Sequence, residues 1–264
     1  MPVCILLAGI GPVHAEAQIN LDQFDLTFSA EFDRPSDIDE KFIHHYRRWG
    51  DLRTLAGNLE QELYVDRAYL DELGAHDVEA PFSVDDGILS ITARPTPEAL
   101  SGKIDLPYLS GMVTTEESFA QTNGYFEIRC RMPAGQGLWP AFWLVGLTHD
   151  EALEIDVVEV LADKPRTIYN SIHTSDRGVE WGIEVLAADS SKDFHTYGVD
   201  WRPDRIDFYV DRIMVGSAPV HLPGPMYMIA NLAVGGEWPG NPTKETAFPA
   251  SFEIDYIRAY AHRQ

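Results

Sequence analysis

The stretch Gly124-Tyr-Phe-Glu-Ile-Arg-Cys-Arg131 places apolar and charged side chains at alternating positions. In an extended strand, successive side chains point to opposite faces, so this pattern predicts a strand whose apolar face packs in a core. Cys130 falls on the apolar face, and we interpret it as a buried, unreactive thiol. The only other cysteine is Cys4, so at most one disulfide could form.

Short stretches with the same alternation recur at residues 88–94, 168–173, 205–210 and 252–260, with 20 glycines and 17 prolines spread along the chain. Asp211-Arg212 separates two such stretches and predicts a hairpin turn. Helical periodicity is scarce, and residues 68–73 are its best candidate. Many short strands broken by turn residues are typical of a sandwich or barrel. The sequence therefore predicts one all-β domain of antiparallel sheets over residues 22–264.

The composition of the 264-residue chain excludes several functions. Its 42 acidic and 20 basic residues give a formal net charge of −22. Nucleic acids and anionic membranes would repel such a surface, and highly charged anionic polymers are disfavoured as substrates. The sequence also contains no phosphate-binding glycine loop, no zinc-binding His-Glu-x-x-His and no Gly-x-Ser-x-Gly elbow. These absences argue against phosphoryl transfer, zinc hydrolysis and serine-esterase chemistry.

The first 17 residues are similar to part of a secretory signal peptide. An apolar run at residues 3–10 precedes Val13-His-Ala15 and Ala15-Glu-Ala17, which offer small residues at cleavage positions. The usual basic start is missing, and the run is too short for a membrane span. We expect a secreted or periplasmic protein, the alternative being an apolar terminus without a targeting role.

The stretch Leu153-Glu-Ile-Asp-Val-Val-Glu-Val160 carries three carboxylates among β-branched residues, which favour a strand. The acid spacing alone says little in so acidic a chain. Unbroken alternation would place Glu154 and Asp156 on one face and bury Glu159 among aliphatic side chains, which is costly for a charge. A β-bulge near Val157-Val158 would return Glu159 to the face of the other two acids, and we favour that arrangement.

Two glutamates on one face have the chemistry of a retaining glycosidase, which needs carboxyl groups about 5–5.5 Å apart. One carboxylate attacks the anomeric carbon, and the other protonates the leaving oxygen and later activates water. Asp156 between them would raise their pKa values by repulsion and keep one of them protonated. The alternative is a solvated acidic strand edge.

Aromatic residues and one histidine suggest a sugar-binding surface. Trp139 and Trp143 share a face of Gly137-Leu-Trp-Pro-Ala-Phe-Trp-Leu-Val145 if that run is extended, and Trp238 follows two glycines. Indole rings present flat apolar faces that suit sugar rings. His173 lies shortly after the acids and could bind substrate or tune a carboxyl. Core packing of the tryptophans and a structural role for His173 are the alternatives.

Several ordered motifs together resemble glycoside hydrolase family 16, the laminarinase and lichenase group, from about residue 28 to residue 260. They are Gly111-Met-Val-Thr-Thr115, Gly124-Tyr-Phe-Glu-Ile-Arg129, Leu138-Trp-Pro-Ala-Phe-Trp143, Glu154-Ile-Asp-Val-Val-Glu159, Phe194-His-Thr-Tyr-Gly-Val-Asp-Trp201, Asn231-Leu-Ala-Val-Gly-Gly236 and Phe252-Glu-Ile-Asp-Tyr-Ile-Arg258. The resemblance implies a jelly-roll β-sandwich with a concave substrate cleft. It also implies endo-cleavage of a β-linked polysaccharide with retention, without a catalytic cofactor.

The resemblance further implies roles for single residues. Glu154 matches the nucleophile, Asp156 the residue that supports it electrostatically, and Glu159 the acid/base. The five-residue separation matches the bulged, laminarinase-like motif and departs from the shorter one of lichenases. Sugar contacts are implied for Asn58, Arg94, Trp139, Trp143, His173 and Trp238. Some members bind a structural calcium, for which Asp255 and Glu31 are the candidates here.

These observations favour a monomeric endo-β-glucanase that attacks internal β-1,3 or mixed β-1,3/1,4 bonds of a polysaccharide. One alternative is a depolymerase of a bacterial exopolysaccharide such as succinoglycan. Another, from a different class, is a non-catalytic carbohydrate-binding sandwich, because a fold does not fix a function.

Overall fold

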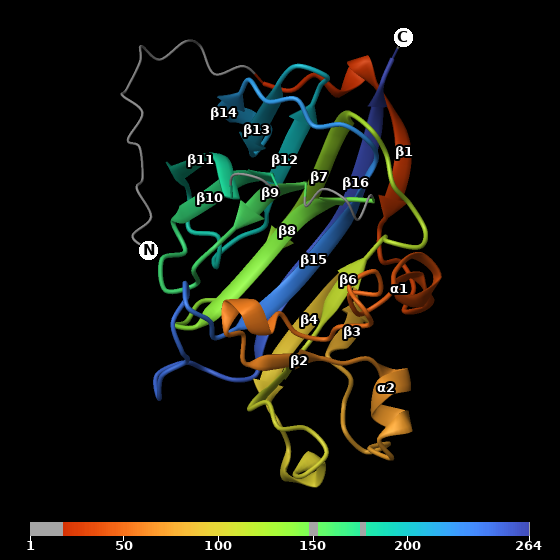
Figure 1. Ribbon diagram of the computed structural model, residues 1–264, viewed down its shortest axis with the longest axis vertical. Helices are drawn as coiled ribbons and strands as arrows, with labels where there is room; N and C mark the ends of the chain where they lie inside the picture. The colour runs from red at the N-terminus through yellow and green to blue at the C-terminus, as the bar shows by residue number, and fades with distance from the viewer. Residues whose placement is uncertain (1–17, 148–152, 175–177, 264) are drawn as a thin grey trace.

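The computed structural model describes residues 18–147, 153–174 and 178–263, which form two β-sheets with few helices. The sheets lie in two layers (Figure 1). The prediction of an all-β sandwich is therefore confirmed. The predicted signal segment, residues 1–17, lies outside the described residues.

The larger sheet has ten strands and packs behind the smaller sheet. They are β1 (Phe24–Ala30), β2 (Glu62–Tyr64), β3 (Phe82–Asp85), β4 (Ile88–Pro95), β5 (Tyr108–Ser110), β7 (Gly124–Arg131), β12 (His195–Trp201), β13 (Ile206–Val210), β14 (Ile213–Ala218) and β16 (Ala250–His262). The order is β14-β13-β12-β7-β16-β4-β5-β2, with β1 on β16 and β3 on β4. Pairing is antiparallel except between β2 and β5.

The smaller sheet has six strands, all antiparallel to their neighbours. They are β6 (Met112–Thr114), β8 (Leu138–Gly146), β9 (Glu154–Glu159), β10 (Thr167–Thr174), β11 (Gly178–Leu186) and β15 (Met226–Val234), in the order β11-β10-β9-β8-β15-β6. The acidic stretch thus lies on β9, between β8 and β10 (Figure 1).

Helices are short, as the weak periodicity predicts. They are α1 (Ser36–Lys41), α2 (Arg67–Glu72) and the 3₁₀ turns η1 (Leu21–Gln23), η2 (Ala56–Asn58) and η3 (Glu98–Leu100). The predicted turn at Asp211-Arg212 joins β13 to β14, and both residues have positive φ (49° and 65°), as two-residue hairpin turns require. No helix in the described part of the chain is long and apolar enough to cross a membrane.

The main core fills the space between the sheets. Phe126, Ile128 and Cys130 of β7 are fully buried there, as the alternation predicts, together with Ile155 and Val157 of β9. Burial raises the pKa of the Cys130 thiol, which agrees with an unreactive cysteine. Because one face of the smaller sheet is committed to this core, its other face is available for a site.

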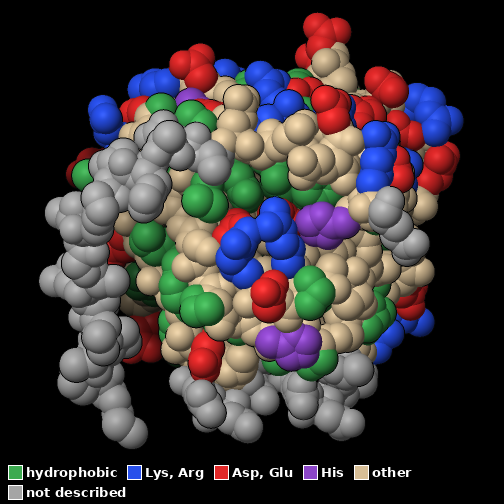
Figure 2. All heavy atoms as spheres, turned by 90° about the horizontal axis from the view of Figure 1, so that it is seen from above, with side chains coloured by type: hydrophobic (Ala, Val, Ile, Leu, Met, Phe, Trp, Pro, Cys, Tyr) green, Lys and Arg blue, Asp and Glu red, His purple; other side chains and the backbone are tan. Residues whose placement is uncertain are grey.

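The surface charge is partly neutralised by local pairs. Figure 2 shows acidic and basic side chains lying intermingled on the face seen from above. Ion pairs such as Arg258–Glu31 and Arg212–Glu127 also link different elements of the larger sheet. The net charge of −22 therefore coexists with many local ion pairs.

Candidate active site

A β-bulge on β9 places the three acids on one face. Glu159 lies opposite Tyr169 of β10, and Asp156 lies opposite Ser171. Between these two pairs β9 advances by three residues, whereas β10 advances by two. The pairing with β8 shifts at the same place, between Phe142 and Trp143. The bulge that the sequence favoured at Val157-Val158 is thus present, and Glu154, Asp156 and Glu159 share the outer face.

Asn170 stabilises the bulge from the neighbouring strand. An extra residue interrupts the ladder and leaves backbone groups in need of partners. The Asn170 side chain is 2% exposed, and its Nδ2 donates to the Val157 carbonyl at 2.6 Å. The freed carbonyl is therefore satisfied without water.

Polar neighbours hold each acid in place. Ser171 Oγ donates to Asp156 Oδ2 at 2.5 Å, and His173 Nε2 lies 2.9 Å from the same oxygen. His173 Nε2 is also 3.8 Å from Glu154 Oε1. At the other end of the strand, Trp139 Nε1 donates to Glu159 Oε1 at 3.0 Å.

The electrostatics of the two glutamates differ. Burial, reinforced by Asp156, raises the pKa of Glu154 well above its ordinary value, and His173 opposes that rise. Burial and the Asp156 charge also raise the pKa of Glu159 well above its ordinary value, opposed only by the neutral Trp139 N–H. Burial lowers the pKa of His173, but its contacts with Asp156 more than compensate, so the net shift is upward. His173 therefore favours the charged form of Glu154, whereas no cation in the described contacts does the same for Glu159.

The acids line a cleft of about 950 Å³ on this face. Its walls carry the aromatic residues Tyr46, Trp49, Trp139, Trp143, Tyr169, Trp181 and Trp238. Its acidic residues are Glu60, Glu154, Asp156, Glu159, Glu180 and Glu184, and the described lining contains no lysine or arginine. An aromatic, acidic cleft suits an uncharged sugar polymer better than an anionic one.

Most of the predicted sugar contacts meet in this cleft. Asn58, Trp139, Trp143, His173 and Trp238 all line it. Trp238 is 44% exposed and packs edge-to-face on Trp139, with ring centroids 5.3 Å apart. Trp143 is only 7% exposed and donates to Asn231 Oδ1 at 2.8 Å, so it forms part of the cleft floor.

Arg94 lies apart from the other predicted sugar contacts. It is not among the residues that line the cleft. It lies on β4 of the larger sheet, where its Nη1 contacts Glu79 Oε2 at 2.8 Å and its Nη2 reaches the Ala80 carbonyl. The guanidinium is thus held by residues of the segment before β3, and its contact with a sugar stays a prediction.

The two calcium candidates fit a metal poorly. Asp255 on β16 contacts the guanidinium of Arg129, and Glu31 accepts from Arg258 at 2.8 and 2.7 Å. A calcium ion would have to displace these arginines. In the described part of the chain, one cluster has metal-ligand geometry, namely Glu154, Asp156 and His173, whose ligand atoms lie within 4.8 Å of one another. Those residues are the candidate catalytic group itself.

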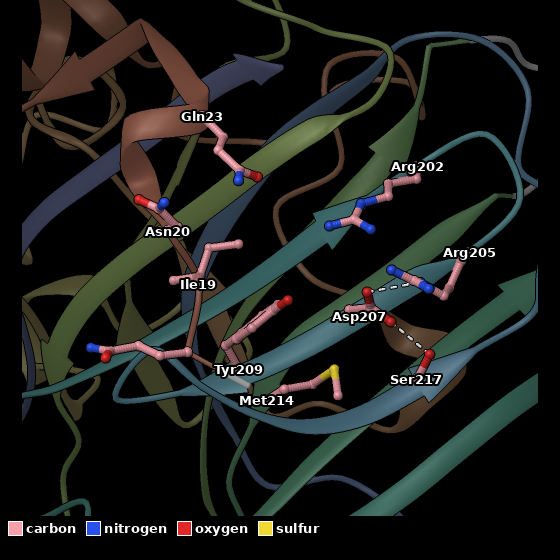
Figure 3. Close-up of a pocket in the computed structure, with 10 residues that line it drawn as sticks. Ile19, Asn20, Gln23, Arg202, Arg205, Asp207, Tyr209, Met214 and Ser217 are labelled. Carbon is pink, nitrogen blue, oxygen red and sulfur yellow. Dashed lines mark hydrogen bonds and ion pairs between the residues drawn. The ribbon is translucent and has the colours of Figure 1, made fainter. Parts of the chain in front are cut away.

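A second, smaller pocket of about 320 Å³ lies against β13 and β14 of the larger sheet (Figure 3). Its arginines are neutralised, because Arg202 contacts Asp200 at 2.5 Å and Arg205 contacts Asp207 at 2.9 Å. Ser217 Oγ donates to the other Asp207 oxygen at 2.6 Å. With its charges paired internally, this pocket has no group poised for chemistry.

Several functional residues escaped the sequence analysis. They are Asn170 and Ser171, which bond to β9, and Tyr169, Asn231 and Glu60, which line the cleft. Alternation along residues 168–173 does place Tyr169, Ser171 and His173 on one face. Because His173 was already a candidate, that pattern could have identified Tyr169 and Ser171 as neighbours of the acids.

Comparisons with known proteins agree with this geometry. The family model described as glycosyl hydrolases family 16 matches residues 78–258. The endo-1,3-1,4-beta-glycanase ExsH of Rhizobium meliloti is 43% identical over 79% of this chain and 44% of that protein. The beta-glucanase of Rhodothermus marinus is 29% identical over 97% of this chain and 91% of that protein. The chain thus spans less than half the length of ExsH.

Solved structures share the architecture. The laminarinase catalytic domain from Thermotoga maritima superimposes with a TM-score of 0.77 at 29% identity, covering 92% of this chain and 100% of that chain. The endo-beta-1,3-glucanase from Pyrococcus furiosus gives 0.77 at 28% identity over 96% of this chain and 100% of that chain. These matches confirm the predicted jelly-roll sandwich.

Proposed function

We propose that this chain, which belongs to family 16 of the glycosyl hydrolases, is an endo-β-glucanase that cleaves internal β-1,3 or mixed β-1,3/1,4 bonds with retention. The observation that carries the proposal is the bulged strand β9, which aims Glu154, Asp156 and Glu159 into one aromatic cleft. The names of the relatives point the same way, since they include endo-1,3-1,4-beta-glycanases and beta-glucanases.

Each glutamate takes the role its surroundings favour. In the first step the Glu154 carboxylate attacks the anomeric carbon, and Glu159 gives its proton to the leaving oxygen as the glycosidic bond breaks. A glycosyl ester on Glu154 results. In the second step a water molecule gives a proton to the Glu159 carboxylate and attacks the anomeric carbon, which releases Glu154 and restores the β configuration.

The neighbours of the acids support this division of roles. The protonated ring of His173, 3.8 Å from Glu154, favours the carboxylate that attacks. Asp156, held by Ser171 and His173, keeps the imidazolium in place. Glu159 has no cation in its described contacts, and its raised pKa favours the protonated form that the leaving group needs.

Other parts of the proposal rest on the sequence alone. The apolar run before residue 18 supports export to the periplasm or the medium. Residues 22–264 are proposed to act as a single catalytic domain and a monomer. The polysaccharide is the partner that the cleft serves.

The charge of the cleft separates the leading substrate from its rival. Six carboxyl groups and no described lysine or arginine line it, so an acidic exopolysaccharide such as succinoglycan would meet repulsion. A non-catalytic binder would have no need for two half-buried glutamates with raised pKa values, because desolvating their charged forms lowers stability.

Reducing-end release from a panel of polysaccharides tests the substrate. We expect laminarin and mixed-linkage β-glucan to be cleaved at least about tenfold faster than succinylated exopolysaccharide at low salt, where repulsion is least screened. Added salt should reduce this difference between the cleavage rates. Faster cleavage of the anionic polymer would make the exopolysaccharide the substrate. Binding to every glucan without cleavage by the wild type would identify a lectin-like protein.

A further inference from the structure

A pair of glutamates outside the catalytic group lies at the wall of the cleft, which Glu60 lines. Glu62 of β2 is fully buried, and its Oε2 accepts from the backbone N–H of Val234 at 2.7 Å. Its Oε1 is buried without a partner from the described donors. The Glu62 carboxyl also contacts that of Glu60. Two charged carboxylates in contact would repel each other strongly in an apolar setting, and a proton at the unpartnered Oε1 of Glu62 that hydrogen-bonds to Glu60 would relieve that repulsion.

Glu60 also fixes the orientation of the Asn58 amide in the cleft wall. It is 7% exposed, its Oε1 accepts from Asn58 Nδ2 at 2.8 Å, and its Oε2 accepts from the backbone N–H of Leu55 at 3.2 Å. A carboxylate can only accept, so the amide of Asn58 must turn its nitrogen toward Glu60. Its Oδ1 is then the end that can accept from a sugar hydroxyl.

The same pair ties two segments of the cleft together. Glu62 bonds Val234, and Gln61 N–H donates to the Val234 carbonyl at 2.8 Å. Glu237 N–H donates to the Asn58 carbonyl at 2.9 Å. These bonds fasten residues 55–62 to the segment that carries Trp238, which packs on Trp139 beside Glu159.

We propose that Glu60 and Glu62 share one proton and act as positioning residues, which orient the Asn58 amide and hold the Trp238 segment for substrate binding. The inference rests on the proposed hydrolysis of β-glucan. Neither glutamate touches the reacting atoms, so the pair acts on substrate affinity and leaves the chemical step to β9.

Steady-state kinetics on laminarin test the pair. Glu62→Leu removes the proton donor and the acceptor for Val234, and Glu60→Gln leaves one acceptor oxygen for the two donors, Asn58 Nδ2 and the Leu55 N–H. Each should raise KM about five- to tenfold, the value of one or two buried hydrogen bonds, with kcat within about threefold of the wild type. Glu62→Gln keeps a donor and an acceptor in the same shape and should restore KM to within about twofold.

Glu127→Gln is the matched control, because Glu127 is a fully buried glutamate of the larger sheet, bonded to Tyr125, Tyr256 and Arg212. It should lower the melting temperature and leave KM unchanged. If Glu62→Leu does not fold, Glu60→Gln decides. The inference alone would be overturned if the folded Glu62→Leu and Glu60→Gln variants kept the wild-type KM. It would also be overturned if Glu62→Gln had a KM as high as that of Glu62→Leu. An inactive wild type would overturn the proposed function and the inference with it.

Discussion

Replacing Glu154 by glutamine is expected to lower kcat on laminarin by at least about 10⁴-fold, because an amide cannot form the glycosyl ester on which both steps depend. Glutamine keeps the size of the side chain, and it removes a half-buried carboxyl whose pKa the fold raises. The variant should therefore fold and still bind the glucan. Initial rates of reducing-end release, with binding followed by calorimetry, measure both properties.

Glu253→Gln is the control for this change. Glu253 lies on β16 of the larger sheet, where it pairs with Arg131, far in the fold from β9. It should keep full activity. A Glu154→Gln enzyme within about tenfold of the wild type would show that another group attacks the sugar.

Replacing Glu159 by glutamine is expected to lower kcat by about 10²–10⁴-fold on glucans, whose leaving oxygen needs a proton. Aryl glycosides with a nitrophenolate leaving group need none, so their cleavage to the glycosyl ester should be nearly unaffected. Pre-steady-state release of the phenolate measures that step. Equal losses on both substrates would contradict the acid role.

The pH dependence of kcat/KM tests the same acid role of Glu159. Burial raises the pKa of Glu159, so the wild type should keep its acid form well above the ordinary value of about 4.3 and lose kcat/KM as pH rises through the raised pKa. In Glu159→Gln that basic limb should disappear. The folded form of Glu159 binds its proton more tightly than the unfolded form, so its ionisation costs stability at higher pH. The variant should therefore melt no lower than the wild type at neutral pH, which excludes unfolding as the cause of inactivity.

Much of the fold could be predicted because its signals are local. Alternation in residues 124–131 identified β7 and its buried face, and the positive φ values at Asp211 and Arg212 match the predicted turn. The bulge on β9 was predictable for a different reason. Burying Glu159 among aliphatic residues is so costly that an irregular strand is the cheaper arrangement.

The sequence could not predict the role of residues whose partners lie far away in the chain. Arg94 pairs with Glu79 and Arg129 with Asp255, and neither pairing leaves a trace in the spacing of the chain. Asn170 satisfies the Val157 carbonyl only because β10 lies beside β9 in that register. The proton shared by Glu60 and Glu62 likewise follows from burial and from the approach of Val234 across the sandwich.

The anomeric configuration of the first product tests most directly whether Glu154 and Glu159 act as a facing pair. Proton NMR spectra recorded in the first minutes of laminarin hydrolysis, before mutarotation, distinguish the two outcomes. Carboxyl groups close enough for one to attack while the other donates a proton predict that the β-anomer forms first and the α-anomer appears only later. Initial formation of the α-anomer would mean a single displacement by water and would contradict the roles assigned to the two glutamates of β9.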